Sequence, residues 1–165
     1  MRIKLRETRE EDLDFVLRVE SDCENRPYIL QWSRERHQEA SRDPDIFHGI
    51  IEAIADGKLL GYFILEGLLS PHRCFLLRRL AIAQKGKGYG RETLRSVKKL
   101  VFEECKAHRL WLDVKDFNQR AKHLYETEGF IIEGKLRENF QGENGFESFY
   151  ILSILEHEYW NRQAQ

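Results

Sequence analysis

One helix is predicted, from its start to its end, by Asn118-Gln-Arg-Ala-Lys-His-Leu-Tyr-Glu-Thr-Glu-Gly-Phe130. Asn118 is a good N-cap, Gly129 suits the position after the last helical residue, and Phe130 starts a strand. Tyr125 lies about two turns after Asn118, so both side chains face the same way. Ala121, between them, is small enough for a ligand to approach the helix closely. The competing interpretation is that Tyr125 is an ordinary core or surface aromatic.

A second stretch, Lys85-Gly86-Lys87-Gly88-Tyr89-Gly90-Arg91, lies between a predicted buried strand and a predicted long helix. Glycines allow positive φ and leave the backbone open to a ligand. The free N–H groups and the dipole of a helix start attract anions, and the basic side chains add positive charge. The stretch therefore predicts an anion-binding loop, and the alternative is a tight turn without a ligand.

Two familiar nucleotide-binding motifs do not fit this loop. A P-loop needs Gly-Lys-Ser/Thr after four spacer residues, and that pattern does not occur in the sequence. The GxGxxG dinucleotide fingerprint fails because Arg91 stands where its third glycine should be. A nucleotide-dependent enzyme is therefore disfavoured.

Taken together, the two stretches resemble the motifs of GNAT acetyltransferases. The first fits Arg/Gln-x-x-Gly-x-Gly/Ala with Lys85, Gly88 and Gly90 in its defined positions, although Lys85 replaces the usual Arg or Gln. The second reads N-x-x-A-x-x-L-Y-x-x-x-G-F. The resemblance covers roughly residues 75–160, and the part after Gly129 is similar to the branch of bacterial spermidine and ribosomal-protein N-terminal acetyltransferases.

This resemblance implies an enzyme that transfers an acetyl group from acetyl-CoA to a primary amine, without a metal. A small amine such as a polyamine is slightly favoured, and the alternatives are a protein N-terminus or a non-catalytic acyl-CoA-binding module. It implies a cofactor site formed by Leu80, Ala81, Ile82, Lys85, Gly86, Lys87, Gly88, Tyr89, Gly90, Arg91 and Asn118. In this site the pantetheine arm pairs with the backbone of residues 80–82 and the phosphates lie on residues 85–91. Tyr125 is the implied proton donor to the sulfur.

The general base is left open by the sequence. Many GNAT enzymes use a carboxylate on the fourth strand, but here that strand reads Leu77-Arg-Arg-Leu80. Glu66, Asp113, Glu143 and a chain of water molecules are equal candidates.

The acceptor amine is expected to contact the first half of the chain. Glu20, Asp22 and Glu24, with Tyr28 and Trp32, form a candidate acidic and aromatic mouth for a cationic amine. The competing interpretation is a solvated helix end next to two core aromatics.

The remaining pattern predicts one domain over residues 1–165 of class α/β (α+β). We expect a single mixed, mainly antiparallel sheet with helices on both faces. The expected strands are 3–8, 47–55, 58–69, 74–82, 109–114, 130–137 and 146–155, with a hairpin loop at 141–145. Thr8 and Glu11 read as a capping box before the first helix, a polar helix is expected at 33–41, and the helix after Gly90 is expected to bury Cys105.

Composition limits the function further. The net charge of −1 predicts neither nucleic-acid nor membrane partners. The three cysteines are scattered, which argues against disulfides or zinc and predicts buried thiols in a reducing cytoplasm. The segment beginning at His157 starts like HExxH but ends in Asn161, so it predicts no metal site. A homodimer is implied only by the resemblance.

Overall fold

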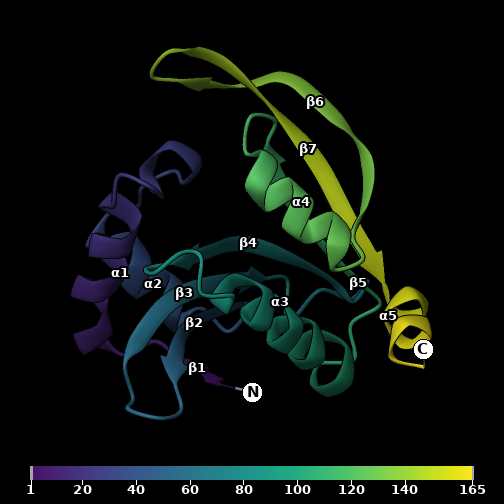
Figure 1. The fold of residues 1–165 in the computed structure, drawn as a ribbon, viewed down its shortest axis with the longest axis horizontal. Coiled ribbons are helices and arrows are strands. Elements are labelled where there is room, and N and C mark those ends of the chain that lie inside the picture. Colours follow the sequence, from purple (N-terminus) through teal and green to yellow (C-terminus); the bar gives the residue numbers. More distant parts are fainter. Residues whose placement is uncertain (1, 165) are drawn as a thin grey trace.

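A computed structural model describes residues 2–164. Seven strands form one sheet in the order β1-β2-β3-β4-β5-β7-β6 (Figure 1). The strands are β1 (Ile3–Glu7), β2 (Ile46–Ala53), β3 (Leu59–Glu66), β4 (Cys74–Ile82), β5 (Arg109–Lys115), β6 (Ile131–Gly142) and β7 (Gly145–Leu155). The helices are α1 (Leu13–Ser21), α2 (Arg34–Arg42), α3 (Tyr89–Lys99), α4 (Gln119–Thr127) and α5 (Glu156–Gln163). Short helical turns lie at Glu10–Asp12, Arg26–Tyr28 and Leu100–Glu104.

Helices cover both faces of the sheet, as predicted. Tyr62 and Phe63 on β3 are both fully buried although they point to opposite faces, which is typical of a strand covered on both sides. The α1 and α2 face packs Val16, Val19, Ala40, Ile50, Tyr62, Ile64 and Ala81. The α3 and α4 face packs Leu94, Val97, Tyr125, Phe63, Leu77 and Leu112. The predicted mixed, mainly antiparallel sheet is confirmed.

The strands β4 and β5 pair along only part of their length. They are parallel, and their register contains the pairs Cys74↔Arg109, Phe75↔Leu110 and Leu76↔Trp111. Every other neighbouring pair of strands in the sheet is antiparallel. Beyond Leu76, β4 continues to Ile82 beside β3, and β5 continues beside β7. The two strands therefore diverge, and one edge of each is left without a strand partner.

Three details of the predicted elements were wrong. The β6–β7 hairpin is much longer than expected, because β6 runs to Gly142 and β7 starts at Gly145. Most of β6 is exposed, so its sequence lacks the apolar alternation that marks a half-buried strand. The helix after Gly90 changes to a π-helical turn at Leu100, and α5 was not predicted.

The predicted capping box at Thr8 was also wrong. Thr8 Oγ1 lies 2.8 Å from His48 Nδ1, whereas the Asp12 carboxylate accepts a hydrogen bond from the Arg9 N–H at 2.8 Å. A 3-10 turn therefore precedes α1, which begins at Leu13.

The prediction of buried thiols was wrong as well. Cys23 lies in the segment after α1 and is exposed, Cys74 is half-buried, and Cys105 follows the π-helical turn and is exposed. All three are free cysteines.

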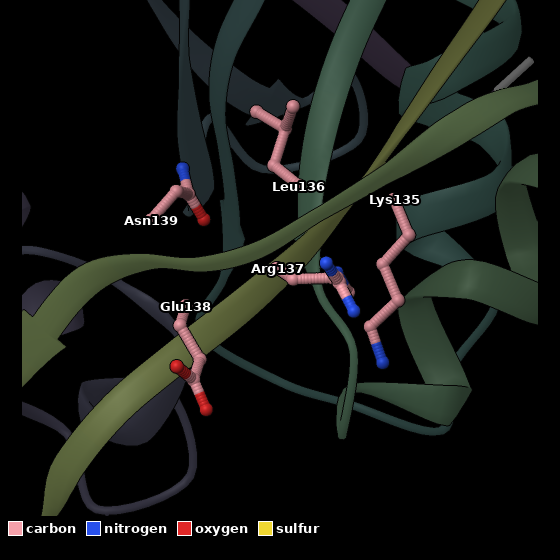
Figure 2. Close-up of a pocket in the computed structure, with 5 residues that line it drawn as sticks. All are labelled: Lys135, Leu136, Arg137, Glu138 and Asn139. Atoms are coloured by element: carbon pink, nitrogen blue, oxygen red, sulfur yellow. The ribbon is translucent and has the colours of Figure 1, made fainter.

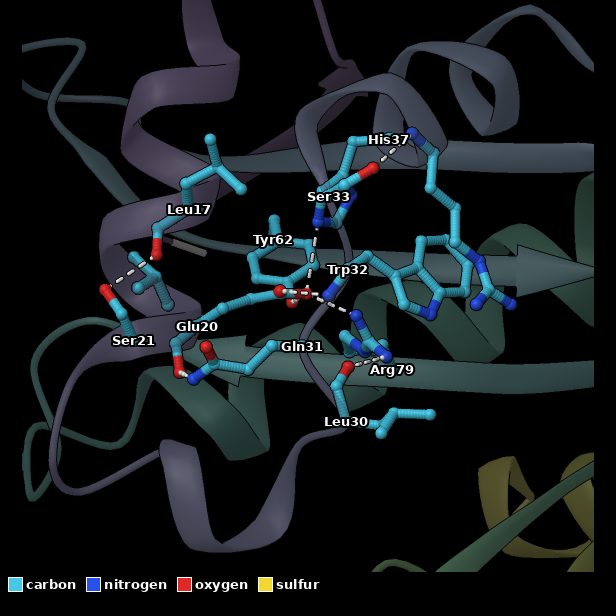
Figure 3. A network of polar contacts seen from close by, with 12 residues as sticks. Leu17, Glu20, Ser21, Leu30, Gln31, Trp32, Ser33, His37, Tyr62 and Arg79 are labelled. Carbon is cyan, nitrogen blue, oxygen red and sulfur yellow. Dashed lines mark hydrogen bonds and ion pairs between the residues drawn. The ribbon is translucent and has the colours of Figure 1, made fainter.

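A buried polar network connects α1, α2, β3 and β4 around the Glu20 carboxylate (Figure 3). Arg79 forms an ion pair with Glu20, and Tyr62 donates a hydrogen bond to it at 2.5 Å. The Trp32 N–H donates to the second Glu20 oxygen at 3.0 Å. Burial alone would raise the pKa of Glu20, but His37, Arg79, Tyr62 and the Trp32 N–H together hold it below its ordinary value.

Two histidines extend this network towards β1. His37 Nε2 lies 3.2 Å from Glu20, and His37 Nδ1 lies 2.9 Å from His48 Nε2. One order of protons fits these contacts: Thr8 donates to His48 and His48 donates to His37, and the remaining His37 nitrogen, Nε2, faces Glu20 as a close polar contact without a hydrogen bond. This order requires a neutral His48. Burial is the main cause that lowers the pKa of His48, to about 3.

We expect this buried histidine to make folding stability depend on pH. Below about pH 6.5 the unfolded chain protonates His48 and the folded chain does not, so stability falls as pH falls towards about 3. Each pH unit in that window costs about 1.4 kcal/mol, or about 2 kcal/mol between pH 7 and pH 5. Urea unfolding at several pH values measures this slope.

The control variants are His48→Gln and His123→Gln. His48→Gln should lower stability at pH 7 and remove most of the slope, whereas His123 is exposed and its replacement should leave the slope unchanged. An unchanged slope in His48→Gln would contradict the assignment.

Candidate active site

A cleft of about 1580 Å³ opens where β4 and β5 diverge. Its walls come from these strands, the loop before α3, α4, the segment between α1 and α2, and the β6–β7 hairpin. The predicted site residues that line it are Glu24, Tyr28, Trp32, Leu80, Ile82, Lys85, Gly86, Gly88, Tyr89, Gly90, Arg91, Asn118 and Tyr125. Two predicted residues do not line it: the side chain of Ala81 is buried in the core, and Lys87 is exposed.

The predicted anion-binding loop has the backbone that such a loop needs. Gly86 and Gly88 have φ values of +78° and +83°, a conformation that favours glycine. Gly88 is the N-cap of α3, so the N–H groups of the first turn of that helix point out of the helix start. Apart from Gly86 and its two chain neighbours, no heavy atom of residues 2–164 lies within 4 Å of the position that a Cβ at Gly86 would occupy. The loop is therefore open to a ligand.

Lys85 provides an independent sign of an anionic ligand. Among the described residues, its Nζ is one of the few buried side-chain nitrogen or oxygen atoms with no hydrogen-bond partner. Burial lowers the pKa of Lys85, while the charges of Glu24 and Asp22 partly oppose this shift. A buried cation without a partner is costly unless a ligand supplies the negative charge. This fits the resemblance, which places phosphates here.

Arg91 is committed to a different contact. It forms an ion pair at 2.7 Å with Glu128, at the end of α4. Glu128 is buried and also accepts from Arg95 at 3.0 Å and from Lys98 at 3.2 Å. This cluster joins α3, which follows the glycine loop, to α4, which carries Tyr125.

Tyr125 and Asn118 lie as the helix pattern predicts. Asn118 Oδ1 accepts a hydrogen bond from the Ala121 N–H at 3.1 Å, so it is the N-cap of α4. Tyr125 packs edge-on against Phe130 and is 9% exposed, at the cleft. Burial, and to a smaller extent the charge of Asp113, raise the pKa of Tyr125 well above its ordinary value. Its hydroxyl therefore keeps its proton at neutral pH.

The structure ranks the three carboxylates that the sequence left equal. Arg78 holds Glu66 with two hydrogen bonds of 2.9 and 2.7 Å, and Glu143 is 86% exposed near the tip of the hairpin. Within residues 2–164, the Asp113 carboxylate makes no ion pair and no hydrogen bond to another residue, and it lines the cleft. Burial raises its pKa, although the charge of Arg78 opposes this. Perturbed acids in clefts are candidates for proton transfer.

The predicted acidic mouth is divided between the core and the cleft. Glu20 is 1% exposed and paired with Arg79, so it is a core residue and does not face an acceptor. Trp32 is 8% exposed, and the guanidinium groups of Arg36 and Arg79 lie 4.1 and 4.6 Å from its ring. Glu24 and Tyr28 remain exposed in the cleft.

One part of the cleft was not predicted from the sequence. Lys115, Phe117, Phe140, Glu147 and Phe149 also line it, and they come from β5, the loop after it, and the hairpin. Alternation along β5 could have placed Lys115 on the same face as Asp113. No local pattern brings the hairpin residues to β5.

A smaller hollow of about 490 Å³ lies on β6 at Lys135–Asn139 (Figure 2). Here β6 bulges, because pairing moves from Leu136↔Phe149 to Phe140↔Glu147. Glu138 has a φ of +50°, and its N–H donates to Ser148 Oγ at 2.9 Å. The bulge brings Asn139 to the main cleft as well.

The described part of the chain offers neither a candidate metal site nor a candidate membrane-spanning helix. Residues 2–164 contain no group of three or more His, Cys, Asp and Glu side chains placed to hold a metal ion. No helix in that range is long and apolar enough to cross a membrane.

Known proteins resemble this chain along its length. Spermidine N(1)-acetyltransferase of Vibrio cholerae is 25% identical over 170 residues, which cover 97% of this chain and 96% of that protein. Spermidine N(1)-acetyltransferase of Escherichia coli K12 is 24% identical over 165 residues, covering 95% and 88%.

Solved structures agree with these relatives. The Vibrio cholerae enzyme in complex with CoA and spermine superposes with a TM-score of 0.87 at 25% identity, covering 97% of this chain and 99% of that one. A structure of the Vibrio cholerae enzyme in complex with manganese ions has a TM-score of 0.82 at 25% identity, covering 98% and 96%.

The family profile gives the assignment. The profile described as acetyltransferase (GNAT) family matches residues 13–130, which include the glycine loop, Asp113 and the whole of α4. This chain therefore belongs to the acetyltransferase (GNAT) family and is an acetyl-CoA-dependent N-acetyltransferase.

Proposed function

We propose that this enzyme acetylates a primary amine of a polyamine. The observation that carries the proposal is that one cleft is lined by Asp113, Tyr125, a basic loop, and a group of carboxylates and aromatic rings. Such a lining suits a flexible cation, because carboxylates accept its N–H groups and rings attract its charge. The named relatives are spermidine acetyltransferases, which supports a small amine over a protein N-terminus.

The acetyl donor occupies the part of the cleft next to β4 in this proposal. The free edge of β4 at residues 80–82 pairs with the pantetheine arm, and an N–H there polarises the thioester carbonyl. The phosphates lie on residues 85–91, where the Lys85 ammonium has no hydrogen-bond partner among the residues that the structure describes. Arg91 is the weakest member of this set, because Glu128 already neutralises it. Asn118 contacts the pantetheine end through the amide nitrogen that its capping role leaves free.

Asp113 and Tyr125 have opposite tasks in the proposed transfer. Asp113 accepts the proton that the acceptor ammonium must lose before its nitrogen can bond to the thioester carbon. Tyr125 donates its proton to the sulfur as the carbon–sulfur bond breaks, and the second proton that the new amide nitrogen loses restores the Tyr125 hydroxyl. Their environments suit these tasks, because the Asp113 carboxylate has no hydrogen-bond or ion-pair partner in the described part of the chain and the Tyr125 hydroxyl is held protonated.

The cellular setting stays a prediction. Three free thiols support a reducing compartment such as the cytoplasm. The net charge of −1 supports a small-molecule partner over nucleic acid or a membrane surface. A homodimer is proposed only from the family resemblance.

Thiol release from acetyl-CoA tests the acceptor class. Spermidine, spermine and diamines should give turnover, and amino acids and short peptides with free N-termini should give little. Turnover confined to the peptides would overturn the polyamine proposal in favour of N-terminal acetylation. If no amine gives thiol release while acetyl-CoA still binds in calorimetry, a non-catalytic acyl-CoA-binding module is favoured.

Asp113→Asn tests the proton acceptor. In the wild type, kcat/KM should rise with pH through the raised pKa of Asp113, because only the carboxylate form accepts a proton. At neutral pH the variant should have a kcat/KM about a hundredfold lower than the wild type. It should also lose the acidic limb of the pH profile, which is the range in which kcat/KM rises with pH. Glu66→Gln, which removes a carboxylate already held by Arg78, should keep the limb. Persistence of the limb in Asp113→Asn would exclude this role.

Tyr125→Phe tests the proton donor. The change removes one hydroxyl and keeps the ring contact with Phe130, so the fold and acetyl-CoA binding should persist. We expect kcat to fall about a hundredfold while the KM for the amine changes little. Initial rates of thiol release at several spermidine concentrations give both constants. An unchanged kcat would show that another group or water protonates the sulfur.

A further inference from the structure

The ammonium group of Lys115 lies in a cage within the cleft. Its Nζ donates a hydrogen bond to the Pro27 carbonyl at 2.9 Å and forms an ion pair with Glu147 at 2.7 Å. The rings of Phe117 and Phe140 lie 5.5 and 5.8 Å from it. We call these four groups the Lys115 cage. The side chains of Lys115 and Glu147 are only 13% and 19% exposed.

The cage is assembled from distant parts of the chain. Pro27 lies between α1 and α2, Phe117 follows β5, and the other two residues belong to the β6–β7 hairpin. Gly142 makes room for it, because a Cβ there would collide with the Glu147 carboxylate. Tyr28 packs against Phe117 at 5.7 Å, and Phe149 against Phe140 at 6.2 Å. The aromatic wall therefore continues beyond the cage.

This set of groups has the chemistry of an alkylammonium site. An ammonium group donates in three directions and accepts none, and here it meets a carboxylate, a carbonyl and two ring faces. Lysine has a flexible four-carbon stem, so its charged end can leave the cage for water without moving the backbone. A primary or secondary amine from a ligand carries the same charge and the same donors.

The cage also lies next to the proposed reaction centre. Asp113 and Lys115 leave the same face of β5 two residues apart, which is about 6.5 Å along a strand. Both line the same cleft. An acceptor with one nitrogen beside Asp113 thus directs the rest of its chain along the wall that leads to the cage.

We propose that the Lys115 cage is the subsite for a second ammonium group of a diamine or polyamine acceptor, and that Lys115 occupies it until the acceptor displaces it. The inference rests on the proposed polyamine activity. Lys115 then sets acceptor affinity by competition, because each bound acceptor must replace an existing ion pair. Acceptors with a single amine gain much less from the cage.

Lys115→Met is the test, because it removes the charge and keeps the length of the side chain. With CoA bound, calorimetry should show spermidine binding about tenfold more tightly to the variant than to the wild type, since the cage is then unoccupied. n-Butylamine has one ammonium group and cannot reach Asp113 and the cage together, so its affinity should gain much less than that of spermidine. Glu147→Gln in the Lys115→Met background should abolish the gain.

Lys135→Met is the matched control. Lys135 also has a carboxylate partner, Asp116 at 2.8 Å, and a ring, Tyr150 at 5.5 Å, but it lies on the hairpin outside the main cleft. Its replacement should leave spermidine affinity unchanged. Thermal unfolding and acetyl-CoA affinity show whether each variant is folded.

Equal or weaker spermidine binding by folded Lys115→Met would overturn the inference. Lys115 would then have a structural role, holding β5 against the segment between α1 and α2. Wild-type turnover is measured separately. If the wild type acetylates no polyamine, the proposed function fails, whereas the calorimetric comparison still decides whether the cage binds an ammonium group.

Discussion

The parallel contact between β4 and β5 is the constraint on which the site depends. These strands pair from Cys74 to Leu76 and then diverge, while each keeps its partner on the other side. A sheet edge in the middle of a fold normally costs free energy, because its N–H and C=O groups lack partners. Here the divergence of the two strands opens the cleft. The unpaired edge of β4 can form hydrogen bonds with an extended ligand, as it would with a neighbouring strand.

The buried Glu20 network keeps one wall of this cleft in place. Arg79 on β4 contacts Glu20 on α1 and also donates to the Leu30 carbonyl at 2.6 Å. A buried ion pair adds little stability compared with apolar packing, so its main contribution is to fix the position of the elements that it joins. The pair fixes the segment between α1 and α2 against β4, and Trp32, which contacts both partners, closes the wall.

Local motifs predicted the glycine loop before α3 and the caps of α4, whereas the hairpin side of the cleft depends on contacts that no short pattern encodes. Asn118, Gly88 and Gly129 act through their own neighbours in sequence, so their roles as caps follow from residue type. Glu20 looked like part of a surface cluster, because partners on β3, β4 and α2 decide its burial. The hairpin was underestimated for the same reason, since exposed residues hold it together by pairing alone.

The charges of the cleft separate groups that are structural from groups that await a ligand. Arg78, Arg79 and Arg91 all have carboxylate partners, so each is already neutralised. Within residues 2–164, Lys85 and Asp113 have none, although burial disfavours the charge of both. Unpaired charges in partly buried positions are unfavourable for stability, and they cluster at sites of binding or proton transfer. Their opposite signs match an anionic donor at the loop and a cationic acceptor at β5, and this match ties the geometry of the cleft to amine acetylation.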